Sequence, residues 1–161
     1  MDCPGGVILE ISKYGYVLNS FTTLEEIGAN GILYDYKTDS LWVLTGNNLV
    51  NVTKNGDIIT SFKLGIENEK ETITPDQLCY DLEGRICFTA DVGADYQEDN
   101  NWLYCVQITG ANLNVLYKYC LKESYAVEGA YFYDNRLYVV NDGLYHNAKN
   151  RKNCVCIYEI E

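Results

Sequence analysis

The sequence contains an internal repeat, which limits the chain to architectures built from similar units placed side by side. Residues 11–21 align with residues 52–62 at a constant offset of 41, and Lys, Gly, Ser and Phe occupy the same places in both copies. A third copy, residues 108–119, has a longer turn. Self-similarity at this period is typical of propellers, solenoids and other repeat arrays.

One complete copy of the repeat lies in residues 30–65. It holds four short apolar runs, each bounded by turn-forming or charged residues, at 31–34, 41–44, 49–52 and 58–62. The last two runs flank a Lys-Asn-Gly-Asp segment, and Asn-Gly supplies the positive φ angles that a tight hairpin needs. Four strands joined by tight connections predict one antiparallel sheet.

The first half of the repeat recurs along the chain. Its copies begin at Asn30, Asp76 and Glu128, so their spacings are 46 and 52 residues. These are the lengths of a four-stranded propeller blade with its loops. The pattern predicts strands at 7–12, 16–22, 31–35, 41–45, 49–53, 57–63, 78–81, 85–90, 102–108, 114–121, 130–133, 137–141 and 154–160.

Both ends of the chain carry an incomplete copy. Residues 156–160 resemble residues 7–11, so each end holds a third-strand motif. We therefore expect an all-β fold of three β-propeller blades, each built from four antiparallel strands, in one domain spanning residues 1–161. Propellers normally close with four to eight blades. We expect either a homodimer that completes a six-bladed propeller or a fragment of a larger one.

Composition narrows the possible partners. The formal net charge is −11 and the pI is near 4.4, so a nucleic-acid backbone or an anionic membrane would be repelled. The first six residues lack a basic start followed by an apolar run, and no apolar stretch is long enough to span a bilayer. We expect a cytoplasmic protein that binds neither nucleic-acid backbone nor membrane.

The seven cysteines are odd in number and mostly lie within apolar runs, which favours reduced, buried thiols. The chain has no Cys-x-x-Cys. Cys154 and Cys156 share a strand face, but a zinc site would need two further ligands, and His146 is the only histidine. We do not expect structural zinc.

Residues 128–134 are Glu-Gly-Ala-Tyr-Phe-Tyr-Asp, and Leu-Tyr-Val-Val follows at 137–140. With the Asn-Gly-Asp hairpin, this pattern resembles three blades of the gluconolactonase-like and phytase-like group of six-bladed β-propellers. The resemblance covers nearly the whole chain. It specifies architecture well and activity poorly, because propellers serve many unrelated functions.

The resemblance implies a divalent cation, calcium or magnesium, held by oxygen ligands near the channel. Glu128 and Asp142 are the positions to which it assigns the metal, with Asp76, Asp91 and Asn141 as further oxygen donors. No cation motif is complete. The alternative is that these Asp and Asn residues form turns and cap strand ends.

Two long loops interrupt the turn after the second strand of successive blades. One, residues 91–101, is acidic but lacks the ligand order of an EF-hand; the other, residues 143–152, is basic. Loops carry function in many folds, so we expect ligand recognition there. The full predicted binding set is Asn30, Asp76, Asp91, Glu128, Asn141, Asp142, Tyr145, His146 and Arg151.

Catalysis has little support in the sequence. There is no Gly-x-Ser-x-Gly elbow, and a single histidine leaves few ways to activate a nucleophile. We therefore assign no catalytic residue and expect a non-enzymatic binding protein that holds a small polar ligand or a protein partner. The alternatives are a metal-dependent lactonase or phosphoesterase, and a phage-like protein that sequesters a host metabolite or signalling nucleotide.

Overall fold

The computed structural model describes residues 6–22, 29–65, 73–92, 100–142 and 153–160. These residues form thirteen β-strands and no helix, which confirms the all-β prediction. A membrane-spanning helix is accordingly not found in this part of the chain. The strands make four antiparallel sheets of two, four, four and three strands in chain order, as the repeat predicts. The chain divides into two compact units, Met1–Leu64 and Gly65–Glu161, which are described separately.

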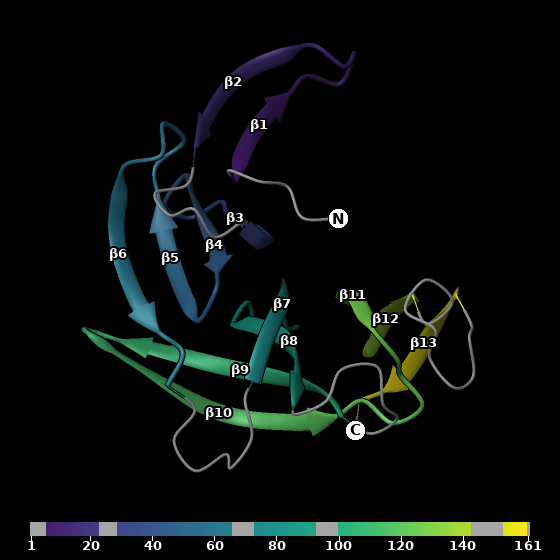
Figure 1. Cartoon of the computed structure of the whole chain (residues 1–161). Coiled ribbons are helices and arrows are strands. Elements are labelled where there is room, and N and C mark those ends of the chain that lie inside the picture. The colour runs from purple at the N-terminus through teal and green to yellow at the C-terminus, as the bar shows by residue number, and fades with distance from the viewer. Residues whose placement is uncertain (1–5, 23–28, 66–72, 93–99, 143–152, 161) are drawn as a thin grey trace. The chain divides into compact units, whose positions relative to one another are not determined.

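The first unit contains a two-stranded and a four-stranded sheet (Figure 1, purple to blue). In the four-stranded sheet, each strand pairs with the next one along the chain. The strands are β1 (Val7–Ile11), β2 (Val17–Thr22), β3 (Ala29–Asp35), β4 (Ser40–Thr45), β5 (Asn48–Val52) and β6 (Ile58–Lys63).

A small apolar core joins the two sheets of this unit. Val43, Val50 and Val52 are buried on the four-stranded sheet, and Ile8 and Phe21 of the hairpin pack against them. Alternation along each strand explains this arrangement, because successive side chains point to opposite faces of the sheet. The hairpin therefore buries one face and exposes the other.

The second unit contains a four-stranded and a three-stranded sheet (Figure 1, teal to yellow). Its strands are β7 (Ile73–Tyr80), β8 (Ile86–Val92), β9 (Asn101–Thr109), β10 (Asn112–Cys120), β11 (Val127–Tyr133), β12 (Arg136–Asp142) and β13 (Asn153–Glu159). Strand β11, the first of its sheet, packs beside β7, the first strand of the preceding sheet. A shared core of buried residues includes Leu103, Leu121, Leu137 and Val139.

All thirteen predicted strands are present, and the differences lie at strand ends. Strand β7 begins at Ile73 rather than at residue 78, and β11 begins at Val127 rather than at residue 130. Polar residues interrupt the apolar pattern in both places, so the sequence did not indicate that the ladder continues past them. The single domain expected from the sequence stays a prediction.

Candidate functional site

The three residues that open the predicted repeat copies each lie at an irregularity in the first strand of a sheet. In β3, Ala29 pairs with Thr45 and Gly31 with Leu44, so Asn30 is an extra residue. Such a β-bulge bends the strand and turns a side chain out of the regular alternation. Asn30 is exposed there.

The same irregularity occurs in both sheets of the second unit. In β11, Val127 pairs with Asn141 and Gly129 with Val140, which leaves Glu128 as the extra residue. In β7, Pro75 pairs with Ala90 and Leu78 with Phe88, so Asp76 and Gln77 together oppose one residue of β8. Bulges thus occur at the three repeat-equivalent positions.

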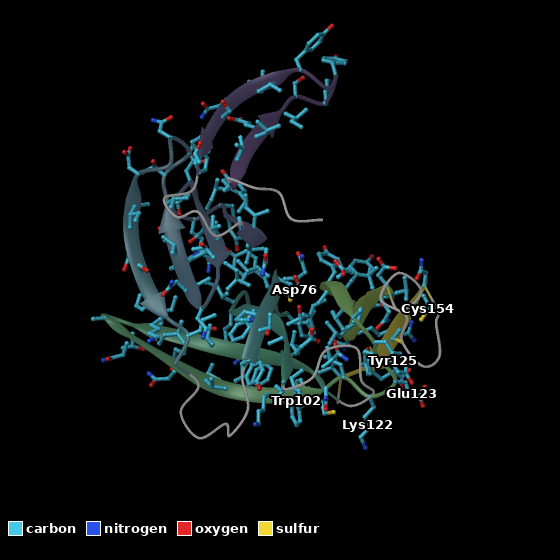
Figure 2. All side chains as sticks on the ribbon, in the orientation of Figure 1. Asp76, Trp102, Lys122, Glu123, Tyr125 and Cys154 are labelled. Carbon is cyan, nitrogen blue, oxygen red and sulfur yellow. The ribbon has the colours of Figure 1, made fainter. Side chains whose placement is uncertain are left out.

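The β7 bulge is held by a side-chain hydrogen bond. The backbone N–H of Gln77 donates to the hydroxyl of Thr89 at 3.1 Å, and Thr89 is buried opposite the bulge. Because Thr89 fixes the extra residue, Asp76 has a defined place on the strand. Figure 2 labels Asp76 on β7, the strand beside which β11 packs.

The remaining described members of the predicted set lie at the ends of second strands. Asp91 lies near the end of β8 and pairs with Thr74, while Asp142 ends β12 and pairs with Asn153. Both carboxylates are half-buried. Within the second unit, the fold therefore places Asp76 and Glu128 on adjacent first strands, with an acidic residue at the end of each second strand.

Asn141 has a structural role in this arrangement. It is 2% exposed, and its amide oxygen accepts a hydrogen bond from the backbone N–H of Tyr125 at 2.9 Å. Its amide nitrogen donates to the carbonyl oxygens of Val139 and Cys154 and to the sulfur of Cys156. The side chain thus ties the segment before β11 to β12 and β13. Contact between Asn141 and a ligand stays a prediction.

The segment that leads into the Glu128 bulge is fixed from several sides. The hydroxyls of Ser124 and Tyr158 lie 2.5 Å apart, and the Tyr158 hydroxyl donates to the carbonyl of Lys122 at 2.7 Å. Burial raises the pKa of Tyr158 to about 12, so the phenol remains a hydrogen-bond donor near neutral pH. The N–H of Asp142 donates to the carbonyl of Ala126. Figure 2 labels Lys122, Glu123 and Tyr125 on this segment.

Carboxylate oxygens are the ligands that calcium and magnesium prefer. Asp76, Asp91, Glu128 and Asp142 offer such oxygens, but in the described residues the three side chains found with ligand atoms within 4.8 Å of one another are Asp81, Cys87 and Cys105. Tyr145, His146 and Arg151, with the basic loop to which they belong, lie outside the described residues, as does most of the acidic loop.

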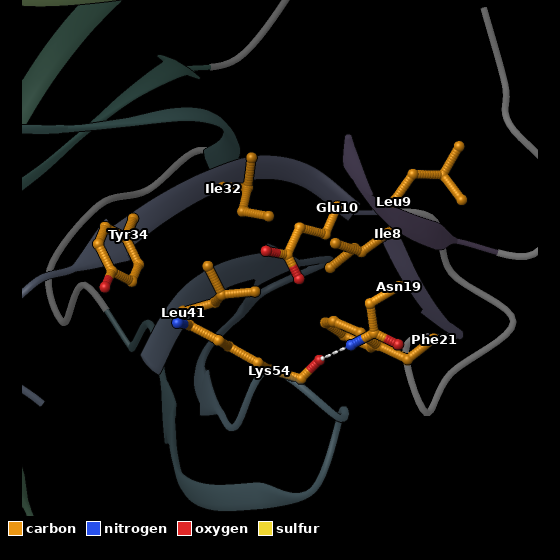
Figure 3. A pocket seen from close by; sticks show the side chains of 9 residues that line it. All are labelled: Ile8, Leu9, Glu10, Asn19, Phe21, Ile32, Tyr34, Leu41 and Lys54. Carbon is orange, nitrogen blue, oxygen red and sulfur yellow. Dashed lines mark hydrogen bonds between the residues drawn. The ribbon is translucent and has the colours of Figure 1, made fainter. Parts of the chain in front are cut away.

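A separate cavity of about 430 Å³ lies in the first unit, between the β1–β2 hairpin and strands β3 and β4 (Figure 3). Most of its lining is apolar, and it includes Ile32 and Leu41. The ammonium of Lys54 lies 2.5 Å from the Asp39 carboxylate and 5.5 Å from the centre of the Tyr34 ring. The sequence did not indicate this cavity. Its walls come from β1, β2, β3 and β4, so it depends on how the hairpin packs against the four-stranded sheet.

None of the six cysteines in the described residues is in a disulfide bond, and Cys79, Cys87 and Cys105 are buried. The expectation of buried thiols is wrong for Cys154, which is exposed at the start of β13. A cluster of two cysteines, an aspartate and a tyrosine in the β7–β10 sheet was also missed. Its members are far apart in sequence, and only the register of the sheet brings them together.

No protein-family model matches the chain, and no curated protein matches it. It is similar in structure to a protein of unknown function from Bacteroides caccae, whose crystal structure was determined at 1.35 Å resolution. The TM-score is 0.59 at 16% identity, and the match covers 84% of this chain and 48% of that chain. The likeness shows the fold alone. This chain spans about half the length of that protein.

Proposed function

We propose that this chain is a non-enzymatic binding protein, one half of a six-bladed β-propeller, that holds a small polar ligand at the bulged first strands. The observation that carries the proposal is the coincidence of bulges with Asn30, Asp76 and Glu128. The sequence repeat places the same three residues at equivalent positions.

The bulges favour a ligand site for a physical reason. An extra residue in a regular ladder interrupts strand pairing, and bulges are enriched at barrel rims and beside active sites. Here each bulge bears a carboxylate or an amide, which can accept hydrogen bonds from hydroxyl or amino groups of a ligand. In a propeller, first strands surround the central channel, so Asp76 and Glu128, on the adjacent first strands β7 and β11 of the second unit, would both lie beside it.

Two exposed apolar surfaces support completion by a second copy: one on β3 and β4 beside the terminal hairpin, and one on the terminal three-stranded sheet. Over β3 and β4, the cavity in Figure 3 lies where the first and second strands of a complete neighbouring blade would pack, and Ile32 is 48% exposed there. The three-stranded sheet supplies first, second and third strands. Its outward face bears Val155 and Ile157, which are 55% and 56% exposed.

A two-fold dimer would place this face of one copy over β3 and β4 of the other, which would cover both apolar surfaces. The similarity to a protein of about twice the length also supports this reading of the chain as a half. Closed two-fold dimers are the commonest symmetric assemblies.

The test is native mass spectrometry of purified protein, which weighs any small molecule that remains bound. We expect one co-purifying polar ligand per chain. Glu128→Gln removes one charged acceptor, and charge-assisted hydrogen bonds contribute about 1.5–3 kcal/mol, so ligand affinity should fall by about tenfold or more. Glu159→Gln is the matched control, since Glu159 lies at the opposite end of the same sheet and pairs with Arg136.

The alternative function predicts a different result. A metal-dependent hydrolase would carry a stoichiometric divalent cation, and it would turn over a lactone or a phosphate ester. Turnover assays separate the two functions, and elemental analysis supports the hydrolase only if Glu128→Gln loses the bound cation. Turnover that Glu128→Gln abolishes and Glu159→Gln preserves would replace the binding function with the hydrolase.

A further inference from the structure

The β7–β10 sheet contains a row of sulfur-bearing and phenolic side chains. In the strand register, Cys79 pairs with Cys87, Cys87 with Cys105, and Cys105 with Tyr117. Directly paired residues in adjacent strands lie on the same face, with their Cβ atoms about 4.5–5.5 Å apart. Four strands thus place three thiols and a phenol side by side.

Asp81, just after β7, faces this row. Its Oδ2 atom accepts hydrogen bonds from the Tyr117 hydroxyl at 2.8 Å, the Cys105 thiol at 3.6 Å and the Arg85 Nε at 2.6 Å. The other oxygen, Oδ1, accepts from the backbone N–H groups of Glu83 and Arg85. The side chain is 3% exposed, so the carboxylate is fixed in one position.

Three possible metal-ligand atoms lie close together in this cluster. One carboxylate oxygen of Asp81 and the sulfurs of Cys87 and Cys105 all lie within 4.8 Å of one another. A zinc ion with bonds of about 2.3 Å to sulfur and 2.0–2.2 Å to oxygen requires ligand atoms about 3.4–3.8 Å apart. The 3.6 Å between Cys105 and Asp81 lies in this range.

The Asp81 side of the cluster borders a cavity, whereas Cys87 and Cys105 are fully buried behind it. A cavity of about 280 Å³ is lined by Asp81, Arg85 and Tyr117, with Phe132 from the neighbouring sheet of the same unit. A metal site needs such an entry path.

We propose that Asp81, Cys87 and Cys105 form a binding site for a thiophilic divalent cation of the zinc class. Tyr117 is a positioning residue, because its hydroxyl bonds to the Asp81 oxygen and lies 3.8 Å from the Cys87 sulfur. Second-shell hydrogen bonds of this kind orient metal ligands. Asp81 follows the C-terminal end of β7, whereas the bulge at Asp76 lies in the middle of that strand.

The charges of the buried site balance in both states. Without metal, two neutral thiols accompany the Asp81–Arg85 ion pair, so the net charge is zero. When a divalent cation binds, the two thiols release two protons to solvent and become thiolates. The cation then offsets both thiolates, and the Asp81–Arg85 charges remain matched. Burial of an uncompensated charge, which is costly, is therefore avoided.

The test uses cobalt(II) and cadmium(II) as probes added to the reduced, full-length chain. We expect one equivalent of cobalt to produce thiolate charge-transfer absorption and the visible bands of tetrahedral coordination. Zinc should displace it and bleach both. Cys87→Ser and Cys105→Ser should each weaken cobalt binding by at least about tenfold. The matched control, Cys154→Ser, removes an exposed thiol elsewhere and should leave the spectrum unchanged.

Circular dichroism shows whether each variant is folded. If a serine variant does not fold, Tyr117→Phe provides a milder second variant. It keeps all three ligands and removes only the orienting hydroxyl, so we expect weaker cobalt affinity with a retained tetrahedral spectrum. A wild-type protein that gives no thiolate band would overturn the proposal. The same holds if Cys87→Ser and Cys105→Ser keep the wild-type spectrum while folded, or if the Tyr117→Phe affinity is unchanged.

Discussion

Aspartates at the ends of first strands stabilise turns in the first two four-stranded sheets. Asp35 accepts a hydrogen bond from the N–H of Lys37, and Asp81 accepts one from the N–H of Glu83, two residues on in each case. Such side-chain bonds mimic a backbone turn and explain why Asp recurs at this place in the repeat. The bulge residues Asp76 and Glu128 lie elsewhere on their strands.

The lowered pKa of Asp35 leads to a prediction about the stability of the protein in acid. Partial burial alone would raise its pKa, but hydrogen bonds from the Lys37 N–H and from Thr38 and Trp42 outweigh it, and the pKa is lowered. A carboxylate with a lowered folded-state pKa contributes stability above its unfolded pKa, near 3.9, and loses it as pH falls through the folded value. Urea unfolding should therefore show Asp35→Asn less stable than wild type at pH 6, with the difference shrinking below about pH 3.5. A difference that stays constant from pH 6 to pH 2.5 would contradict this.

At the scale of elements, the hairpins that end two repeat copies have the same turn in different surroundings. Gly15 and Gly56 both have positive φ angles, +85° and +91°, and both donate their N–H to the residue three places before. A Cβ at Gly15 would meet nothing within 4 Å. At Gly56 it would lie 2.7 Å from the ring of Phe21, which packs on the core of the first unit.

These two glycines make a matched pair of substitutions. Gly15→Ala should lower the free energy of unfolding by about 1–2 kcal/mol, the cost of a left-handed conformation for an L-residue. Gly56→Ala should lower it by about 1–3 kcal/mol more, because the Phe21 ring must also shift in its packed surroundings. Chemical denaturation of both variants checks the difference. Equal losses would mean that Phe21 moves without cost.

At the scale of the whole molecule, the incomplete terminal sheets determine the predicted assembly. Each leaves apolar side chains exposed: Ile32 beside the cavity over β3 and β4, and Ile157 on the outward face of β13. Exposed apolar faces and unpaired sheet edges favour association. In the proposed dimer, one kind of contact, made twice by the two-fold symmetry, would cover both surfaces.

Light scattering and analytical ultracentrifugation of charge-insertion variants test the dimer. Ile32→Lys and Ile157→Lys should each shift the protein towards monomer and raise the dissociation constant by about a hundredfold, from the loss of about 2–3 kcal/mol per buried side chain. Ile59→Lys is the control, because Ile59 has a similar exposure of 55% but lies on β6, the outermost strand of its sheet. A folded wild-type monomer at micromolar concentration would rule out the dimer.

The sequence by itself determined the number, order and grouping of the strands. Apolar alternation and turn residues such as Asn55-Gly56 involve only a few neighbouring positions. They can therefore be recognised in the sequence without knowing which strand pairs with which. The repeat also selected Asn30, Asp76 and Glu128 as equivalent positions, although neither the bulges nor the earlier starts of β7 and β11 could be foreseen. A bulge depends on which residue pairs with which, and local composition does not specify that register.

The tertiary structure alone decided which distant side chains meet. Asn141, a candidate ligand on its sequence position, is buried as a hydrogen-bonding link between segments. Cys87 and Cys105 are 18 positions apart in the chain but directly paired across two strands. Asp81 and Tyr117 contact them on the same face of the sheet. Strand pairing brings residues that are distant in sequence into contact. Which residues meet depends on the strand register, and only the folded sheet fixes that register.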